Sequence, residues 1–169
     1  MQRRDNNALT LSLARVLSVS LSLCLSVSRS LAASMWSQVK GDALTPATTK
    51  GIFERLRTGG ENGGYWSACG AHAIADVRDL TTGFDSSVPD GVATLPASKS
   101  TEMITFTLAN GATATLRTSG TEPKVKYYVE MDVDGASVGP QAAQAQVAAL
   151  ARTIVDEMLQ PDVHGLELS

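Results

Sequence analysis

The sequence has 169 residues, of which 43% are hydrophobic, 18% charged and 5% aromatic, and its formal net charge is −3. This length suits one domain, or one domain with a tail, and the acidic balance argues against a protein that binds nucleic acid by charge alone. Two cysteines and two histidines are too few for a disulfide framework or a zinc cluster.

Residues 1–44 differ in composition from the rest of the chain. Serine occupies almost every second position from 17 to 28, among leucine and valine. Three interpretations remain open: a secretory signal, an organelle transit peptide, and a gene-model artefact, since a TC-dinucleotide repeat encodes alternating serine and leucine. A membrane span is not expected, because the run is rich in serine. We predict no packed structure up to about Lys40, and no loss of thermal stability when this segment is deleted.

Residues 45–169 are expected to form the folded domain. Pro46 suits the first turn of a helix, which the Gly-Gly pair at 59–60 ends. Alternation of apolar and polar residues predicts a strand over 73–80. Residues 85–100 are rich in serine, proline, glycine and aspartate, which is typical of a long loop.

Three more strands and a second helix are expected after this loop. β-Branched and aromatic residues indicate a strand over 103–108, an Asn-Gly pair indicates a hairpin turn, and residues 112–117 form the returning strand. A further strand is expected over 125–133, and a helix begins at Pro140 and ends at Pro161. Adjacent strands with short turns imply an α+β fold, in which an antiparallel sheet of about four strands carries two helices on one face. The expected apolar stripe of the second helix is Ala143, Val147, Leu150, Ile154 and Met158.

A polar turn separates the last two strands, and its composition exceeds what a tight hairpin needs. Ser119 and Thr121 offer hydroxyl groups, and Gly120 allows a positive φ, which would let successive amide N–H groups converge on an anion. Arg117 and Lys126 bring positive charge to the two ends of the turn. These residues predict a phosphate-sized cradle. The alternative that remains open is a polar loop with solvated charges.

The segment TLRTSGTEPKVKYYVE, residues 115–130, resembles the C-terminal domain of the α-D-phosphohexomutases. Those enzymes carry an Arg-x-Ser-Gly-Thr-Glu-Pro-type loop that binds the phosphate of a phosphosugar. Residues 79–87 and 103–106 extend the resemblance to the eukaryotic branch that includes phosphopentomutase and glucose-1,6-bisphosphate synthase. The similarity runs from about Thr49 to about Pro161. It implies phosphate contacts by Arg117, Ser119, Gly120, Thr121 and Lys126, and loop-shaping roles for Glu122 and Pro123.

The resemblance also implies what this chain lacks. Family members carry a phosphoserine loop, a magnesium-binding loop and a sugar-selecting loop in three preceding domains, and none of these motifs occurs here. We therefore expect no catalytic residue and no metal ligand in this chain, although the full-length family uses magnesium. The expected partners are a hexose or pentose phosphate and the missing mutase domains, without nucleic acid or membrane.

The resulting hypothesis is a phosphate-binding fragment of a phosphoglucomutase-like intramolecular phosphotransferase, which alone does not interconvert sugar phosphates. The alternatives are a non-catalytic phosphosugar-binding module and a non-functional fragment. The resemblance implies a cytoplasmic location. A genuine targeting segment at the N-terminus would instead imply secretion or import into an organelle.

Overall fold

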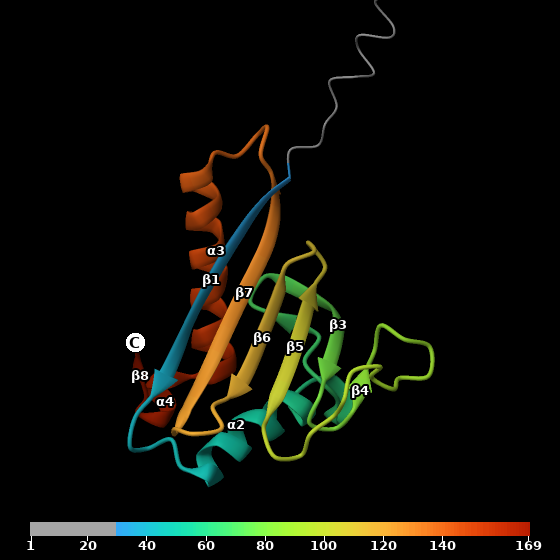
Figure 1. The fold of residues 1–169 in the computed structure, drawn as a ribbon, viewed down its shortest axis with the longest axis vertical. Helices are drawn as coiled ribbons and strands as arrows, with labels where there is room; N and C mark the ends of the chain where they lie inside the picture. The colour runs from blue at the N-terminus through green and yellow to red at the C-terminus, as the bar shows by residue number, and fades with distance from the viewer. Residues whose placement is uncertain (1–29) are drawn as a thin grey trace, which may run out of the picture.

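The computed structural model describes residues 30–169, which form an antiparallel sheet with helices on one side (Figure 1). Eight strands lie in this part of the chain, in the order β2-β3-β5-β6-β7-β1-β8, and β4 pairs with β3. The strands are β1 (Ser30–Lys40), β2 (Ala68–Cys69), β3 (His72–Asp79), β4 (Phe84–Asp85), β5 (Met103–Leu108), β6 (Thr113–Thr118), β7 (Lys124–Asp134) and β8 (Glu167–Leu168).

The predicted α+β class and antiparallel pairing are confirmed, but the predicted number of about four strands is wrong. Strands β2, β4 and β8 have two residues each, which is too short for an alternating pattern to show. The remaining extra strand, β1, lies within the segment that we expected to be unpacked.

Strand β1 pairs with β7 along its whole length, from Ser30 opposite Asp134 to Lys40 opposite Lys124. Val39 is completely buried in the core. The expectation of no packed structure up to Lys40 is therefore wrong for residues 30–40, and the low-complexity segment assigned to 1–44 includes a strand of the sheet. The serine-rich run at 17–28 lies outside the described residues, so its three interpretations stay predictions.

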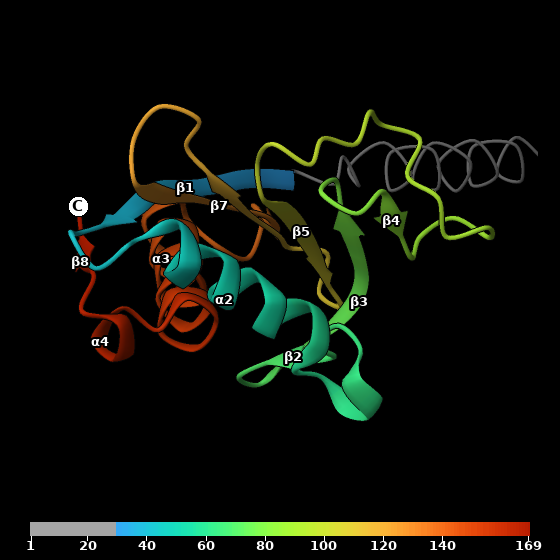
Figure 2. The same ribbon diagram turned by 90° about the horizontal axis from the view of Figure 1, so that it is seen from below.

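The helices cover one face of the sheet (Figure 2). Thr45 caps the first helix, because its hydroxyl oxygen accepts a hydrogen bond from the Thr48 amide at 3.1 Å. The apolar stripe predicted for the second helix is buried throughout. Helix bounds are α2 (Pro46–Thr58), α3 (Pro140–Ile154), its π-helical continuation η2 (Val155–Leu159) and α4 (Pro161–His164), with a 3-10 turn η1 (Glu61–Gly63) after α2. None of the helices in residues 30–169 is long and apolar enough to cross a membrane.

The end of the second helix differs slightly from the prediction. Gln160, with φ of +47°, interrupts the helix, and Pro161 then begins α4 instead of only ending the helix before it. Pro161 is suited to that place, because the first helical position needs no amide donor.

The two faces of the sheet are different environments. On the face toward the helices, Phe106, Leu116 and Val125 are fully buried. The other face is open, and Trp36 on β1 remains 68% exposed there. Successive residues of a strand point to opposite faces, so residues that flank buried positions on β6 and β7 lie on the open face. The candidate site lies at the end of this face, where β6 turns into β7.

Candidate functional site

Residues 119–123 form the turn that connects β6 to β7, and local hydrogen bonds close this turn. The Ser119 amide donates to the Lys124 carbonyl at 2.9 Å, and the Lys124 amide donates to the Glu122 carbonyl at 2.8 Å. The Lys124 ammonium also pairs with the Glu122 carboxylate, which lowers the pKa of Glu122. These contacts define the shape of the turn on the side that precedes β7.

Arg117 and Lys126 lie directly opposite each other on β6 and β7, at the entrance to the turn. Both line a hollow of about 190 Å³ that also includes Ser119 and Gly120. The Arg117 guanidinium lies over the ring of Tyr128, 5.6 Å from its centroid. Within residues 30–169, neither cation forms an ion pair with a carboxylate. Both charges are thus available to an anion.

The backbone of the turn offers further donors. No hydrogen bond within the described residues uses the amide groups of Gly120, Thr121 or Glu122. The positive φ anticipated at Gly120 for an anion-binding turn is wrong, because φ of this residue is not positive. No residue of the turn is left-handed, and the hydrogen bonds of Ser119 and Lys124 close it without one. These three residues are exposed, but without a left-handed residue their amides do not form the nest that alternating backbone conformations would give.

A second hollow, which we call the lysine cleft, borders the same turn. It has a volume of about 560 Å³ and lies between the turn, the start of α2 and the segment before β5. Ser119 and Gly120 line both hollows, whereas Thr121 lines only the lysine cleft. The five predicted phosphate contacts are therefore divided between two neighbouring spaces. Other lining residues of the lysine cleft include Pro46, Lys50, Lys99, Ser100 and Glu122.

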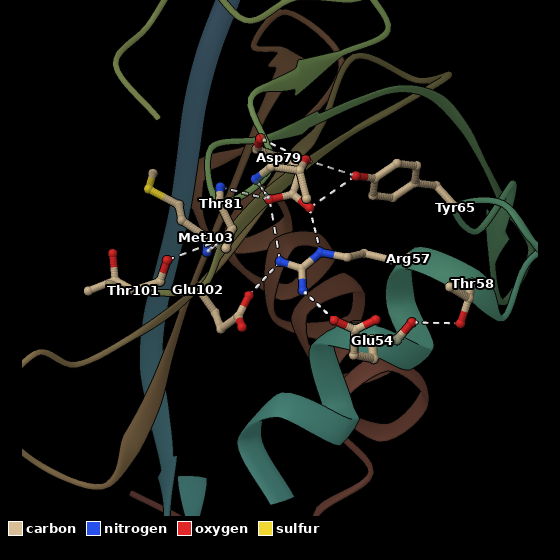
Figure 3. Close-up of polar contacts among 10 residues, drawn as sticks. Glu54, Arg57, Thr58, Tyr65, Asp79, Thr81, Thr101, Glu102 and Met103 are labelled. Carbon is tan, nitrogen blue, oxygen red and sulfur yellow. Dashed lines mark hydrogen bonds and ion pairs between the residues drawn. The ribbon is translucent and has the colours of Figure 1, made fainter. Parts of the chain in front are cut away.

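A buried polar network, centred on Arg57 of α2, lies beside the turn (Figure 3). It was not predicted from the sequence. Arg57 donates from Nε to Asp79 Oδ2 at 2.6 Å, and from Nη2 to Glu102 Oε2 at 2.5 Å. Tyr65 donates its hydroxyl to Asp79 Oδ2 at 3.0 Å. Burial alone would raise the pKa of Asp79, but the hydrogen bonds from Arg57 and the Thr81 amide outweigh it and lower the pKa.

This network continues into the turn. The Glu102 amide donates to Thr118 Oγ1 and the Thr118 amide donates to the Glu102 carbonyl, both at 3.0 Å. Thr118 directly precedes Ser119, so Arg57 is linked to the turn through Glu102. No local pattern could have revealed this, because 22 residues separate Arg57 from Asp79 and 45 separate it from Glu102. The only sign in the sequence was that Arg57, Asp79 and Glu102 lie at or next to the ends of the predicted helix and strands.

Metal-ligating groups do not gather in the described part of the chain. Among residues 30–169, no three or more histidine, cysteine, aspartate or glutamate side chains form a group that could hold a metal ion.

Part of the chain is similar in sequence to a known protein family. Residues 74–153 match the model of the phosphoglucomutase/phosphomannomutase C-terminal domain. The chain is 46% identical over 120 residues to human phosphopentomutase and 47% identical over 121 residues to glucose 1,6-bisphosphate synthase of Pongo abelii. It is 42% identical over 119 residues to a probable phosphoribomutase of Schizosaccharomyces pombe.

These alignments cover 70 to 72% of this chain, and the chain spans about 20% of the length of each of these relatives. The predicted resemblance to the phosphohexomutase C-terminal domain is confirmed. Residues 74–153 belong to the family of phosphoglucomutase/phosphomannomutase C-terminal domains.

Proposed function

We propose that the hollow between Arg117 and Lys126 binds the phosphate group of a phosphosugar. One observation carries this proposal: two cations without a carboxylate partner in residues 30–169 lie opposite each other, and they line one hollow with Gly120, whose amide makes no hydrogen bond in that part of the chain. A phosphate dianion needs several convergent donors and a compensating charge, and this arrangement supplies both.

Each residue has a distinct role in the proposed contact. The planar guanidinium of Arg117 suits two parallel hydrogen bonds to phosphate oxygens, and packing on Tyr128 limits its orientations. Lys126 acts as a point charge. The hydroxyl of Ser119 and the amide of Gly120 border the same hollow and can donate to the anion. Thr121 approaches from the lysine cleft, while Glu122 and Pro123 shape the turn.

The names of the relatives support a wider proposal. We infer that the domain holds a hexose or pentose phosphate in a larger mutase, whose other domains supply the reacting phosphoserine and magnesium. The described residues contain no fitting group of metal ligands, so we place no step of phosphoryl transfer on them. We expect the chain alone not to interconvert glucose 1-phosphate and glucose 6-phosphate. The same resemblance is our reason to propose a cytoplasmic location.

Titration of the full chain with glucose 6-phosphate, followed by amide NMR, tests the binding proposal. We expect shifts over residues 117–126 and a dissociation constant of about 1 mM, equivalent to ~4 kcal/mol, because one loop supplies only part of a substrate site. Arg117→Ala should remove the shifts, since a charge-assisted hydrogen bond contributes about 1.5–3 kcal/mol. Glucose serves as the uncharged control ligand. Absence of shifts at about 10 mM glucose 6-phosphate would refute the proposal.

A further inference from the structure

Two lysines line the lysine cleft without a carboxylate partner. Lys50 lies on α2 and Lys99 on the segment before β5, and neither forms an ion pair within residues 30–169. The two acids of this cleft, Glu102 and Glu122, are paired with Arg57 and Lys124. The uncompensated charge in the cleft is therefore positive.

The segment that carries Lys99 is attached to the rest of the fold on both sides. The Ser98 amide donates to the Leu80 carbonyl at 2.8 Å, and the Thr81 hydroxyl donates to the Thr101 carbonyl at 3.2 Å. The hydroxyl groups of Ser98 and Ser100 are also hydrogen-bonded, 2.8 Å apart. These contacts fix the backbone around Lys99 at the wall of the cleft, although it belongs to a long connection between β4 and β5.

The size and remaining donors of the cleft suit a small anionic ligand. Its volume of about 560 Å³ lies within the usual range of ~300–1,000 Å³ for small-molecule sites. Thr121 contributes a hydroxyl group from the turn, and Ser100 contributes one from the opposite wall. The cleft thus combines two available cations with hydroxyl donors, as the recognition of phosphate requires.

We propose that the lysine cleft is a second anion subsite, which binds a phosphate group through Lys99 and Lys50. It shares Ser119 and Gly120 with the hollow of Arg117 and Lys126, but it uses a different pair of cations. This proposal extends the proposed function, because two neighbouring phosphate positions would then border one turn.

Amide NMR of the full chain titrated with inorganic phosphate tests this subsite, with chloride added to keep ionic strength constant. We expect two groups of shifts, one at residues 117 and 126 and one at residues 50 and 99–101. Lys99→Gln should weaken the binding seen at 99–101 by about tenfold or more, while binding at 117 and 126 changes less than about twofold. Lys99→Arg should retain binding at both places. Arg152→Gln removes one exposed positive charge on α3, outside the cleft, and is the matched control.

The outcomes separate this subsite from the proposed function. If Arg117→Ala abolishes the shifts at 117 and 126 but not those at 99–101, both proposals stand. If phosphate shifts only residues 117 and 126, or if Lys99→Gln changes nothing, the second subsite is refuted while the first remains. If Arg117→Ala abolishes both groups of shifts, there is one site and not two. Absence of any shift with about 10 mM phosphate refutes both.

Discussion

The Nε of Arg57 lies 2.6 Å from Oδ2 of Asp79, and the Asp79 residue is completely buried. This ion pair connects the last turn of α2 to the end of β3. Because the same guanidinium also reaches Glu102, whose backbone is bonded to Thr118, it couples the position of the helix to the turn between β6 and β7.

Arg57→Ala should destabilise the fold by about 3 kcal/mol or more, because it leaves a buried carboxylate without its cation. Urea unfolding followed by circular dichroism measures the change. The control is Arg152→Ala, which breaks an exposed pair with Asp156 and should leave the unfolding midpoint nearly unchanged. Equal effects of the two variants would show that burial does not strengthen the Arg57 pair.

The pH dependence of stability should depend on Asp85. The Ser87 hydroxyl and the Arg78 guanidinium donate to its carboxylate and lower its pKa to about 2. The unfolded value is about 3.9, so the folded state favours the charged form. This contribution is complete above about pH 4 and is lost as pH falls toward 2.

Thermal midpoints measured between about pH 2 and pH 5 test this prediction. Asp85→Asn should flatten the fall of the midpoint in this window, and Ser87→Ala should flatten it less, because the Arg78 bond remains. Parallel curves for the parent chain and Asp85→Asn would contradict the assignment.

The regular elements of the fold were predictable because their signals are local. Strand β5 and the buried stripe of α3 follow from periods of two and 3.6 residues, and the turn residues between strands follow from composition. The cations and hydroxyl groups of the site were recognised in the same way. Strand β1 was not, because it closely follows the serine-rich run at 17–28 and its partner β7 is remote in sequence. Contacts such as Arg57 with Asp79 leave no periodic trace, and the composition of the turn does not determine φ at Gly120.

Two substitutions on β1 test whether this unexpected strand belongs to the core. Val39 is fully buried and Trp36 is 68% exposed on the opposite face. Val39→Ala should therefore cost about 2 kcal/mol through lost burial and a residual cavity. Trp36→Ala should change stability by no more than about 0.5 kcal/mol. Chemical denaturation measures both, and a silent Val39→Ala would mean that β1 does not pack in solution as the structure has it.

Substitution of Gly120 by alanine tests why the turn contains a glycine. Its φ is not positive, and a Cβ added there would have nothing within 4 Å, so neither conformation nor packing requires glycine. The anion proposed above, bound close to the backbone, would be a physical reason for glycine at this position. Gly120→Ala should leave stability unchanged but weaken glucose 6-phosphate binding by about tenfold, which corresponds to ~1.4 kcal/mol.

Gly111→Ala is the matched comparison, because Gly111 also has free space around it but has φ of +84°. That substitution should cost about 1–2 kcal/mol of stability, since an alanine is strained in the left-handed region, and should leave ligand affinity unchanged. Denaturation and the NMR titration, applied to both variants, separate the two effects. A loss of stability in Gly120→Ala would mean that the turn itself needs glycine, and an unchanged affinity would mean that the phosphate does not approach this part of the backbone.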